Sequence, residues 1–289
     1  MRQRLISAAV LVPVVVIVFV AGQPWLTLGI AALAAIAAYE AAQLVRAAGL
    51  PASPRLAVIW TPLTVIAYTL AVELGDRSNF WIILVPGIAA LVIVAAIPAM
   101  SQPDPRTGLL SWIGSMFAAL YPSLLAFAAA FAGFYPGPQR ESLFGYRLET
   151  GHLWLVVLVA TVWALDSAAY LAGRYHGRGR FMQHISPNKT WSGVVGGTTV
   201  AILTSAALVG ASTGNPLAGG VIGLLIAIAA QAGDLAESLL KRAARVKDSG
   251  TLIPGHGGFL DRVDSFLFAA PVLYFAVAVL FPFLSEIPW

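Results

Sequence analysis

Apolar residues in this chain fall into long blocks that are separated by short polar segments. We interpret nine of these blocks, each of roughly 18 to 25 residues, as membrane-spanning helices, because that length crosses ~30 Å of hydrocarbon. The predicted spans are Leu5–Ala21, Trp25–Val45, Leu56–Leu74, Trp81–Met100, Leu109–Phe134, Leu153–Gly173, Val194–Ala211, Val221–Leu240 and Val263–Leu284. Tyr121-Pro122 interrupts the fifth span, which could therefore form two shorter helices.

Composition places the chain among membrane proteins. Hydrophobic residues make up 59% of it and charged residues only 10%, whereas soluble domains carry roughly 25% charged residues. We therefore predict an all-α fold, a polytopic transmembrane helical bundle that forms a single integral membrane domain over residues 1–289. In this interpretation residues 1–150 are scaffold helices, and residues 151–289 carry the chemistry. The absence of Cys excludes disulfides, thiolate ligands and Cys nucleophiles.

The first span also has the basic start and apolar run of a signal peptide. Phe19-Val20-Ala21 would be a poor cleavage site, and Gly22-Gln23-Pro24 makes a tight turn into the second span. We therefore expect this segment to be retained as a helix.

The Lys and Arg residues predict the orientation of the chain. With nine spans and a cytoplasmic N-terminus, all but three of the 17 Lys and Arg residues lie on the cytoplasmic side, as the positive-inside rule requires. The exceptions are Arg77, Arg140 and Arg147. The two largest basic groups then share the cytoplasmic side, in the loops after the sixth and eighth spans, where we expect the functional site.

Acidic residues gather at the helix ends that flank the second of these loops. The eighth span ends in polar residues spaced i, i+3, i+4 and i+7, which share one helix face: Asp234, Glu237, Ser238 and Lys241. Carboxylates one turn apart suit Mg²⁺, although a salt bridge to Lys241 would also explain them. Asp261 and Asp264 form a second i, i+3 pair at the start of the ninth span, and we therefore favour a metal site.

The loop between these acidic pairs is rich in glycine and positive charge. Gly255, Gly257 and Gly258 precede a helix start, where backbone N–H groups can bind an anion. Its basic residues are Lys241, Arg242, Arg245, Lys247 and Arg262. Together these features predict a phosphate cradle, and the alternative is a flexible turn flanked by residues that bind lipid headgroups. His256 could act as an acid or base, donate to phosphate, or only form the turn.

Polar residues after the sixth span point to the same chemistry. Asp166 lies late in an apolar helix, where an unpartnered carboxylate is costly. Ser186-Pro187 and Lys189-Thr190 resemble a helix start with a capping hydroxyl and an exposed cation, suited to a second phosphate contact or to a positive-inside anchor. We expect Asp166 and Lys189 to complete the site.

Glu40 lies within the second predicted span. It could bind a cation, but we favour contact with a polar neighbour from another helix.

Three segments of the chain resemble the CDP-diacylglycerol synthase (phosphatidate cytidylyltransferase) family. Residues 238–264 read SLLKRAARVKDSGTLIPGHGGFLDRVD, residues 166–174 read DSAAYLAGR, and residues 186–193 read SPNKTWSG. Asn188 and Ser192 depart from the family pattern, in which Lys and Glu are common at these two positions. The N-terminal half resembles the family only in its hydropathy.

The resemblance implies that CTP and phosphatidic acid react, with Mg²⁺, to give CDP-diacylglycerol and pyrophosphate. The residues expected at the reaction centre are Asp234, Asp261, Lys241, Lys247 and His256. The residues expected to bind substrate are Lys189, Ser186, Thr190, Arg242, Asp248, Gly257, Gly258 and Arg262. The candidate metal ligands are Asp234 and Asp261, with Glu237, Asp264 and Asp166.

The resemblance also implies a multi-pass protein of the cell membrane that acts at the cytoplasmic face, forms a homodimer and binds no nucleic acid. A lipid or polyprenol kinase would need similar residues but not this motif. An ion transporter would spread polar residues towards the middle of the membrane. The D-G-x-x-A-R start of enzymes that transfer phosphatidyl groups is absent from the sequence.

Overall fold

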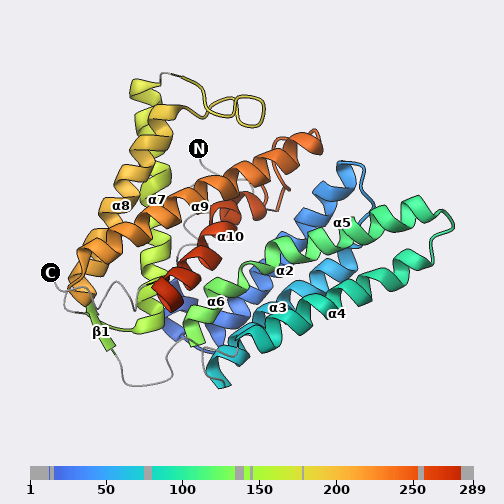
Figure 1. The fold of residues 1–289 in the computed structure, drawn as a ribbon, viewed down its shortest axis with the longest axis horizontal. Helices are drawn as coiled ribbons and strands as arrows, with labels where there is room; N and C mark the ends of the chain where they lie inside the picture. Colours follow the sequence, from blue (N-terminus) through green and yellow to red (C-terminus); the bar gives the residue numbers. More distant parts are fainter. Residues whose placement is uncertain are drawn as a thin grey trace. The chain divides into compact units, whose positions relative to one another are not determined.

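The computed structural model describes residues 13, 16–74, 80–133, 140–143, 146–177, 179–252 and 257–280. Its helices are α2 (Trp25–Ala47), α3 (Pro54–Leu74), α4 (Phe80–Met100), α5 (Pro105–Ser123), α6 (Ala126–Gly133), α7 (Thr150–His176), α8 (Trp191–Thr213), α9 (Pro216–Ala243) and α10 (Leu260–Phe275), the last continued by a π-helical turn, Ala276–Leu280 (Figure 1). A short antiparallel hairpin joins β1 (Arg140–Leu143) to β2 (Tyr146–Glu149).

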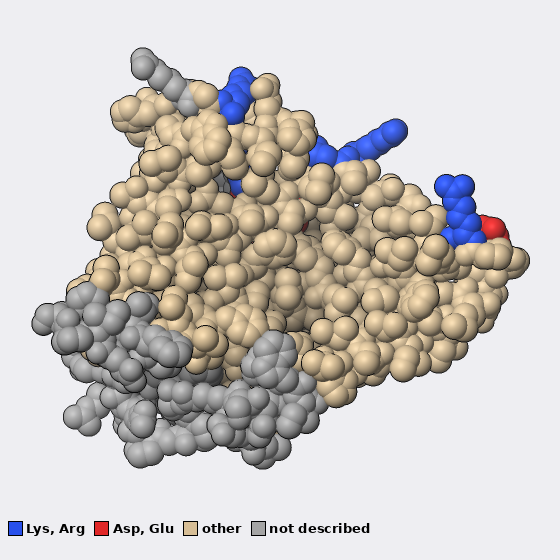
Figure 2. All heavy atoms as spheres, viewed as in Figure 1, with Lys and Arg blue, Asp and Glu red and all other residues tan. Residues whose placement is uncertain are grey.

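The helical membrane architecture predicted from hydropathy is confirmed. Within the described ranges, eight helical segments are long and apolar enough to cross a membrane. They correspond to the second to ninth predicted spans, and most of the first, Leu5–Ala21, lies outside the described residues. On the described part of the face drawn in Figure 2, Lys, Arg, Asp and Glu side chains are few, as contact with lipid requires.

The predicted interruption of the fifth span is also confirmed. The chain turns at Leu124 and Leu125, the two residues between the end of α5 and the start of α6. Here the backbone N–H groups of Leu124 and Leu125 donate to carbonyls three residues earlier, on Tyr121 and Pro122. Pro122 disfavours a continuous helix because its ring crowds the preceding turn.

The chain divides into two compact units. The first unit consists of Met1–Gly133 and Leu240–Val263, and the second consists of Phe134–Leu239 and Asp264–Trp289. The glycine-rich segment after α9 therefore belongs to the same unit as the N-terminal helices.

Small residues let the helices of the first unit approach closely. A cluster of fully buried side chains joins α2, α3, α4 and α5: Ala38, Ala42, Ala57, Leu91, Ala118 and Ala119. Beside it, the buried Thr61 hydroxyl of α3 donates to the Ala119 carbonyl of α5 at 3.0 Å. Close packing and interhelical hydrogen bonds are what hold helices together in lipid.

Glycines have the same role in the second unit, where α7 and α8 lie side by side. A Cβ on Gly197 of α8 would lie 2.9 Å from the Leu165 carbonyl oxygen of α7. One on Gly223 of α9 would lie 2.8 Å from the Ala201 carbonyl oxygen of α8. Three helices of the unit are therefore packed at backbone contact.

Gly223→Ala is expected to destabilise the second unit more than Gly220→Ala. Both positions are in α9, so each substitution brings the same gain in helix propensity. A Cβ on Gly220 would lie 3.7 Å from Ile202, an ordinary contact, whereas one on Gly223 overlaps the α8 backbone. The overlap should cost about 1–3 kcal/mol. Thermal unfolding of the two variants in the same detergent measures the difference, and equal midpoints would contradict the packing described.

Candidate active site

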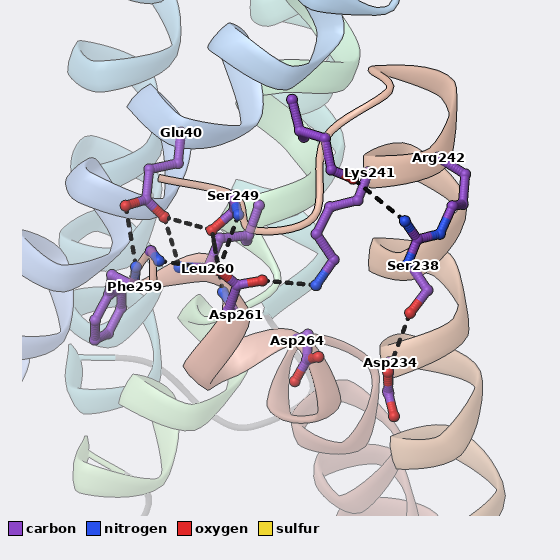
Figure 3. Close-up of polar contacts among 12 residues, drawn as sticks. Glu40, Asp234, Ser238, Lys241, Arg242, Ser249, Phe259, Leu260, Asp261 and Asp264 are labelled. Atoms are coloured by element: carbon purple, nitrogen blue, oxygen red, sulfur yellow. Dashed lines mark hydrogen bonds and ion pairs between the residues drawn. The ribbon is translucent and has the colours of Figure 1, made fainter. Parts of the chain in front are cut away.

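In the first unit, Asp261 lies in the first turn of α10 and is surrounded by hydrogen-bond donors (Figure 3). The Lys241 ammonium lies 2.6 Å from Oδ1. Oδ2 accepts hydrogen bonds from the backbone N–H of Ser249 at 2.8 Å and of Gly258 at 2.9 Å. The Ser249 hydroxyl is 2.9 Å from the same oxygen. Such charge-assisted bonds fix the orientation of the carboxylate.

Glycine is required at two places beside this carboxylate. Gly257 has a φ of +80°, which other residues rarely adopt. A Cβ on Gly258 would overlap the Ser249 hydroxyl and lie 2.6 Å from Glu40 Oε2. In the structure these glycines make room for the chain's own carboxylates, and the Gly258 amide that the sequence suggested for phosphate donates to Asp261.

The second unit brings together a different set of predicted residues. Lys189 Nζ lies 2.8 Å from Asp234 Oδ2, and both side chains are partly exposed. Asp166 of α7 lies close enough to interact electrostatically with both of them. Ser238, one turn after Asp234, is 3.4 Å from its Oδ1. The sequence predicted that Asp166 and Lys189 would complete a site with Asp234 and Asp261. Three of these four residues, Asp166, Lys189 and Asp234, interact within the second unit.

Lys189 is positioned by the loop between α7 and α8. The Phe181 N–H donates to the Lys189 carbonyl at 2.9 Å, and the Trp191 N–H donates to the Gly179 carbonyl at 3.1 Å. The rings of Phe181 and Trp191 pack edge to face. The loop is thereby closed on itself just before α8 begins.

Two expectations about this loop need correction. Lys189 is not an exposed cation, because its ammonium is paired with Asp234 and its side chain is only 21% exposed. The capping hydroxyl of α8 is that of Thr190, which accepts from the Gly193 N–H at 3.1 Å. Ser186 instead lies earlier in the loop, where its carbonyl accepts from the Lys189 N–H.

Two residues of the α9 polar stripe form ion pairs with residues outside it. Lys241 pairs with Asp261 of α10, and Asp234 pairs with Lys189. Glu237, between them on the helix, is fully buried. Asp234 and Asp261 are therefore each paired with a lysine from a different segment of the chain.

The remaining candidates lie in less enclosed positions. Exposed side chains are found at Arg242, Lys247, Asp248 and Arg262. Asp264 Oδ1 accepts from the backbone N–H of Ser265. His256 lies outside the described residues.

The carboxylates of the described residues are potential ligands for a divalent cation. Among the described residues, no three His, Asp or Glu side chains are grouped so as to hold a metal ion together. Asp166 and Asp234 are two carboxylates within electrostatic range of each other, and Asp234 also pairs with Lys189. Mg²⁺ is commonly bound by one or two carboxylates, with water and substrate phosphates completing the octahedron. These two carboxylates therefore match the number and type of protein ligands that such an ion needs.

Two residues of the Asp261 group were not among the predicted site residues. Ser249 was visible only as part of the motif, and its hydroxyl proves to lie between two carboxylates. Glu40 is a charge within a predicted span, and the expected contact with polar neighbours is confirmed by its hydrogen bonds to Ser249, Phe259 and Leu260.

Comparison with known proteins covers nearly the whole chain. Residues 2–280 match the model of the cytidylyltransferase family. A phosphatidate cytidylyltransferase from Synechocystis is 31% identical over 99% of both chains. One from Brucella melitensis is 45% identical over 50% of this chain and 55% of its own. One from Haemophilus influenzae is 37% identical over 66% of this chain and 65% of its own. The chain belongs to the cytidylyltransferase family.

Proposed function

We propose that this protein is a phosphatidate cytidylyltransferase, which transfers CMP from CTP to phosphatidate and releases pyrophosphate. The observation that carries the proposal is the similarity to the Synechocystis enzyme along 99% of both chains. The spans agree with a lipid substrate, because the chain is a multi-pass membrane protein. The product, CDP-diacylglycerol, is a precursor for phospholipid synthesis.

The reaction is an in-line displacement at phosphorus. An oxygen of the phosphatidate monoester attacks the α-phosphorus of CTP, and the bond from that phosphorus to the β-phosphate bridging oxygen breaks as pyrophosphate leaves. The monoester is already anionic near neutral pH, so positioning and charge neutralisation should dominate over general-base catalysis.

The side chains around Asp261 in the first unit and those around Asp234 in the second unit suit positioning and charge neutralisation. Lys189 and Lys241 provide fixed positive charge, and exposed Arg242, Lys247 and Arg262 provide more for the phosphates. Asp166 and Asp234 would hold Mg²⁺ within the second unit. When bound, the ion would neutralise charge on the phosphate oxygens.

The cellular arrangement follows from the sequence and belongs to the same proposal. The positive-inside distribution supports a cytoplasmic N-terminus and an active site on the cytoplasmic side of the cell membrane. CTP would then come from the cytosol and phosphatidate from the bilayer. Homodimer formation is proposed from the family resemblance alone.

The purified protein, reconstituted with phosphatidate and Mg²⁺, is expected to transfer label from α-labelled CTP to lipid. Wild-type activity with CTP is compared with that given by dCTP and ATP. A lipid product labelled from γ-labelled ATP would support a kinase instead, and no lipid product with any nucleotide would contradict the proposal. Chelation of divalent cations should abolish transfer, and activity that survives it would contradict the metal assignment.

A further inference from the structure

Glu40 is a buried carboxylate in the N-terminal helices. It lies in α2, is only 5% exposed, and has fully buried Ala37, Ala38 and Ala41 beside it in the sequence. Removing a carboxylate from water is costly unless hydrogen-bond donors replace the water. Its contacts should therefore reveal what this residue does.

Those donors come from the start of α10 and the loop before it (Figure 3). Glu40 Oε1 accepts from the backbone N–H of Phe259 at 3.0 Å, and Oε2 accepts from that of Leu260 at 2.7 Å. The first N–H groups of a helix have no partner within the helix and carry its positive dipole end. Glu40 thus caps α10 from a different helix.

The same carboxylate also reaches the loop that holds Asp261. Glu40 Oε2 is 3.0 Å from the Ser249 hydroxyl, whose oxygen is 2.9 Å from Asp261 Oδ2. The hydroxyl has one proton and serves one carboxylate at a time, while its oxygen also lies 3.3 Å from the Asp261 N–H. Ser249 therefore links the two acids directly.

The loop is shaped around Glu40. A Cβ on Gly250 would lie 2.6 Å from Glu40 Oε1, and one on Gly258 would lie at the same distance from Oε2. Glycine at both positions therefore makes room for a carboxylate that the N-terminal part of the chain supplies.

We infer that Glu40 is a positioning residue, which sets the orientation of Asp261 through Ser249 and the first turn of α10. Loss of Glu40 frees the helix start and the Ser249 hydroxyl together, so the Asp261–Lys241 pair shifts. The inference deepens the proposed function and rests on it. It gives a part in the reaction to a helix that composition alone marks as scaffold.

Glu40→Gln tests this with little change in shape. One carboxylate oxygen becomes an NH₂ group, which then faces a backbone N–H donor of Phe259 or Leu260. Its control is Thr61→Val, which removes a buried hydrogen bond between α3 and α5 in the same unit without touching the loop. Both variants are assayed at temperatures at which the folded fraction equals that of the wild type.

Kinetics provide the first readout. Glu40→Gln should lower kcat about tenfold or more, while KM for CTP stays within about twofold and Thr61→Val keeps the wild-type kcat. Ser249→Ala should also lower kcat, and the double variant should be no slower than the slower single variant, because both act on Asp261. Additive losses, or a wild-type kcat in Glu40→Gln, would overturn the inference.

Lysine reactivity provides a second readout that needs no activity. The chain has three lysines, and Lys241 is paired and shielded whereas Lys247 is exposed. Amine labelling followed by mass spectrometry should show Lys241 reacting more slowly than Lys247 in the wild type. In Glu40→Gln the ratio of the Lys241 labelling rate to the Lys247 labelling rate should rise several-fold. In Thr61→Val this ratio should not change.

The two readouts separate the ways in which the inference can fail. Lower kcat with raised Lys241 labelling supports it. Unchanged labelling, or raised labelling with wild-type kcat, overturns it and leaves Glu40 a structural cap. A wild-type protein that makes no CDP-diacylglycerol overturns the proposed function itself and the inference with it, and is recognised without any variant.

Discussion

Asp261→Asn is expected to abolish CMP transfer, lowering kcat by about 10³-fold or more, while the protein still inserts and folds. Both oxygens of the Asp261 carboxylate face donors, the Lys241 ammonium on one side and two backbone N–H groups on the other. An amide has one oxygen and one NH₂ group, so one set of donors must face another donor. The negative charge that holds Lys241 is lost as well.

The assay measures lipid product from α-labelled CTP with the variant in detergent, and size-exclusion chromatography reports folding. Asp104→Asn is the matched control, because Asp104 is an exposed acid outside the candidate site. Its side chain caps α5 by accepting a hydrogen bond from the Thr107 N–H, and an Asn side chain can accept the same bond. Transfer at the wild-type rate by Asp261→Asn would show that this carboxylate is not needed for the reaction.

Lys189→Met is expected to lower kcat/KM for CTP about 10²-fold or more. The Lys189 ammonium lies 2.8 Å from Asp234 and interacts with Asp166, so its removal leaves two mutually repelling carboxylates without that cation. A phosphate would also lose one cation that the loop between α7 and α8 holds in place. Lys189→Arg should recover only part of the activity, since it keeps the charge but has a different shape.

Steady-state kinetics at several CTP concentrations measure this effect. Arg106→Met, at an exposed cation just inside the start of α5, is the control for a loss of one positive charge and should keep wild-type kcat/KM. If Lys189→Met and Arg106→Met were equally active, the pairing with Asp234 would have no part in catalysis.

Much of the fold could be read from the sequence because lipid imposes a simple requirement. A backbone in hydrocarbon must satisfy its own hydrogen bonds, so a sufficiently long apolar block becomes a helix. The helices extend beyond the predicted spans, as α9 does by beginning at Pro216 rather than Val221. Hydropathy does not detect such helix ends. The start of α9 is instead marked by Asn215, a residue type typical of helix caps, whose side-chain oxygen accepts a hydrogen bond from the Ala218 N–H.

The candidate site was only partly predictable. Spacing along one helix correctly placed Asp234 and Lys241 on α9. Spacing could not show which lysine pairs with which carboxylate, because the two partners of each pair come from different segments of the chain. Lys189 reaches Asp234 only because the preceding loop folds back on itself.

The sequence by itself determined that this is a multi-helical membrane protein of the cytidylyltransferase family, because hydropathy and the motif of residues 238–264 are local properties. Only the tertiary structure decided what the motif's glycines are next to and which groups Glu40 contacts. Glu40 and Leu260 are 220 residues apart in sequence. A buried carboxylate must find its donors wherever packing brings them, so only the folded chain identifies them.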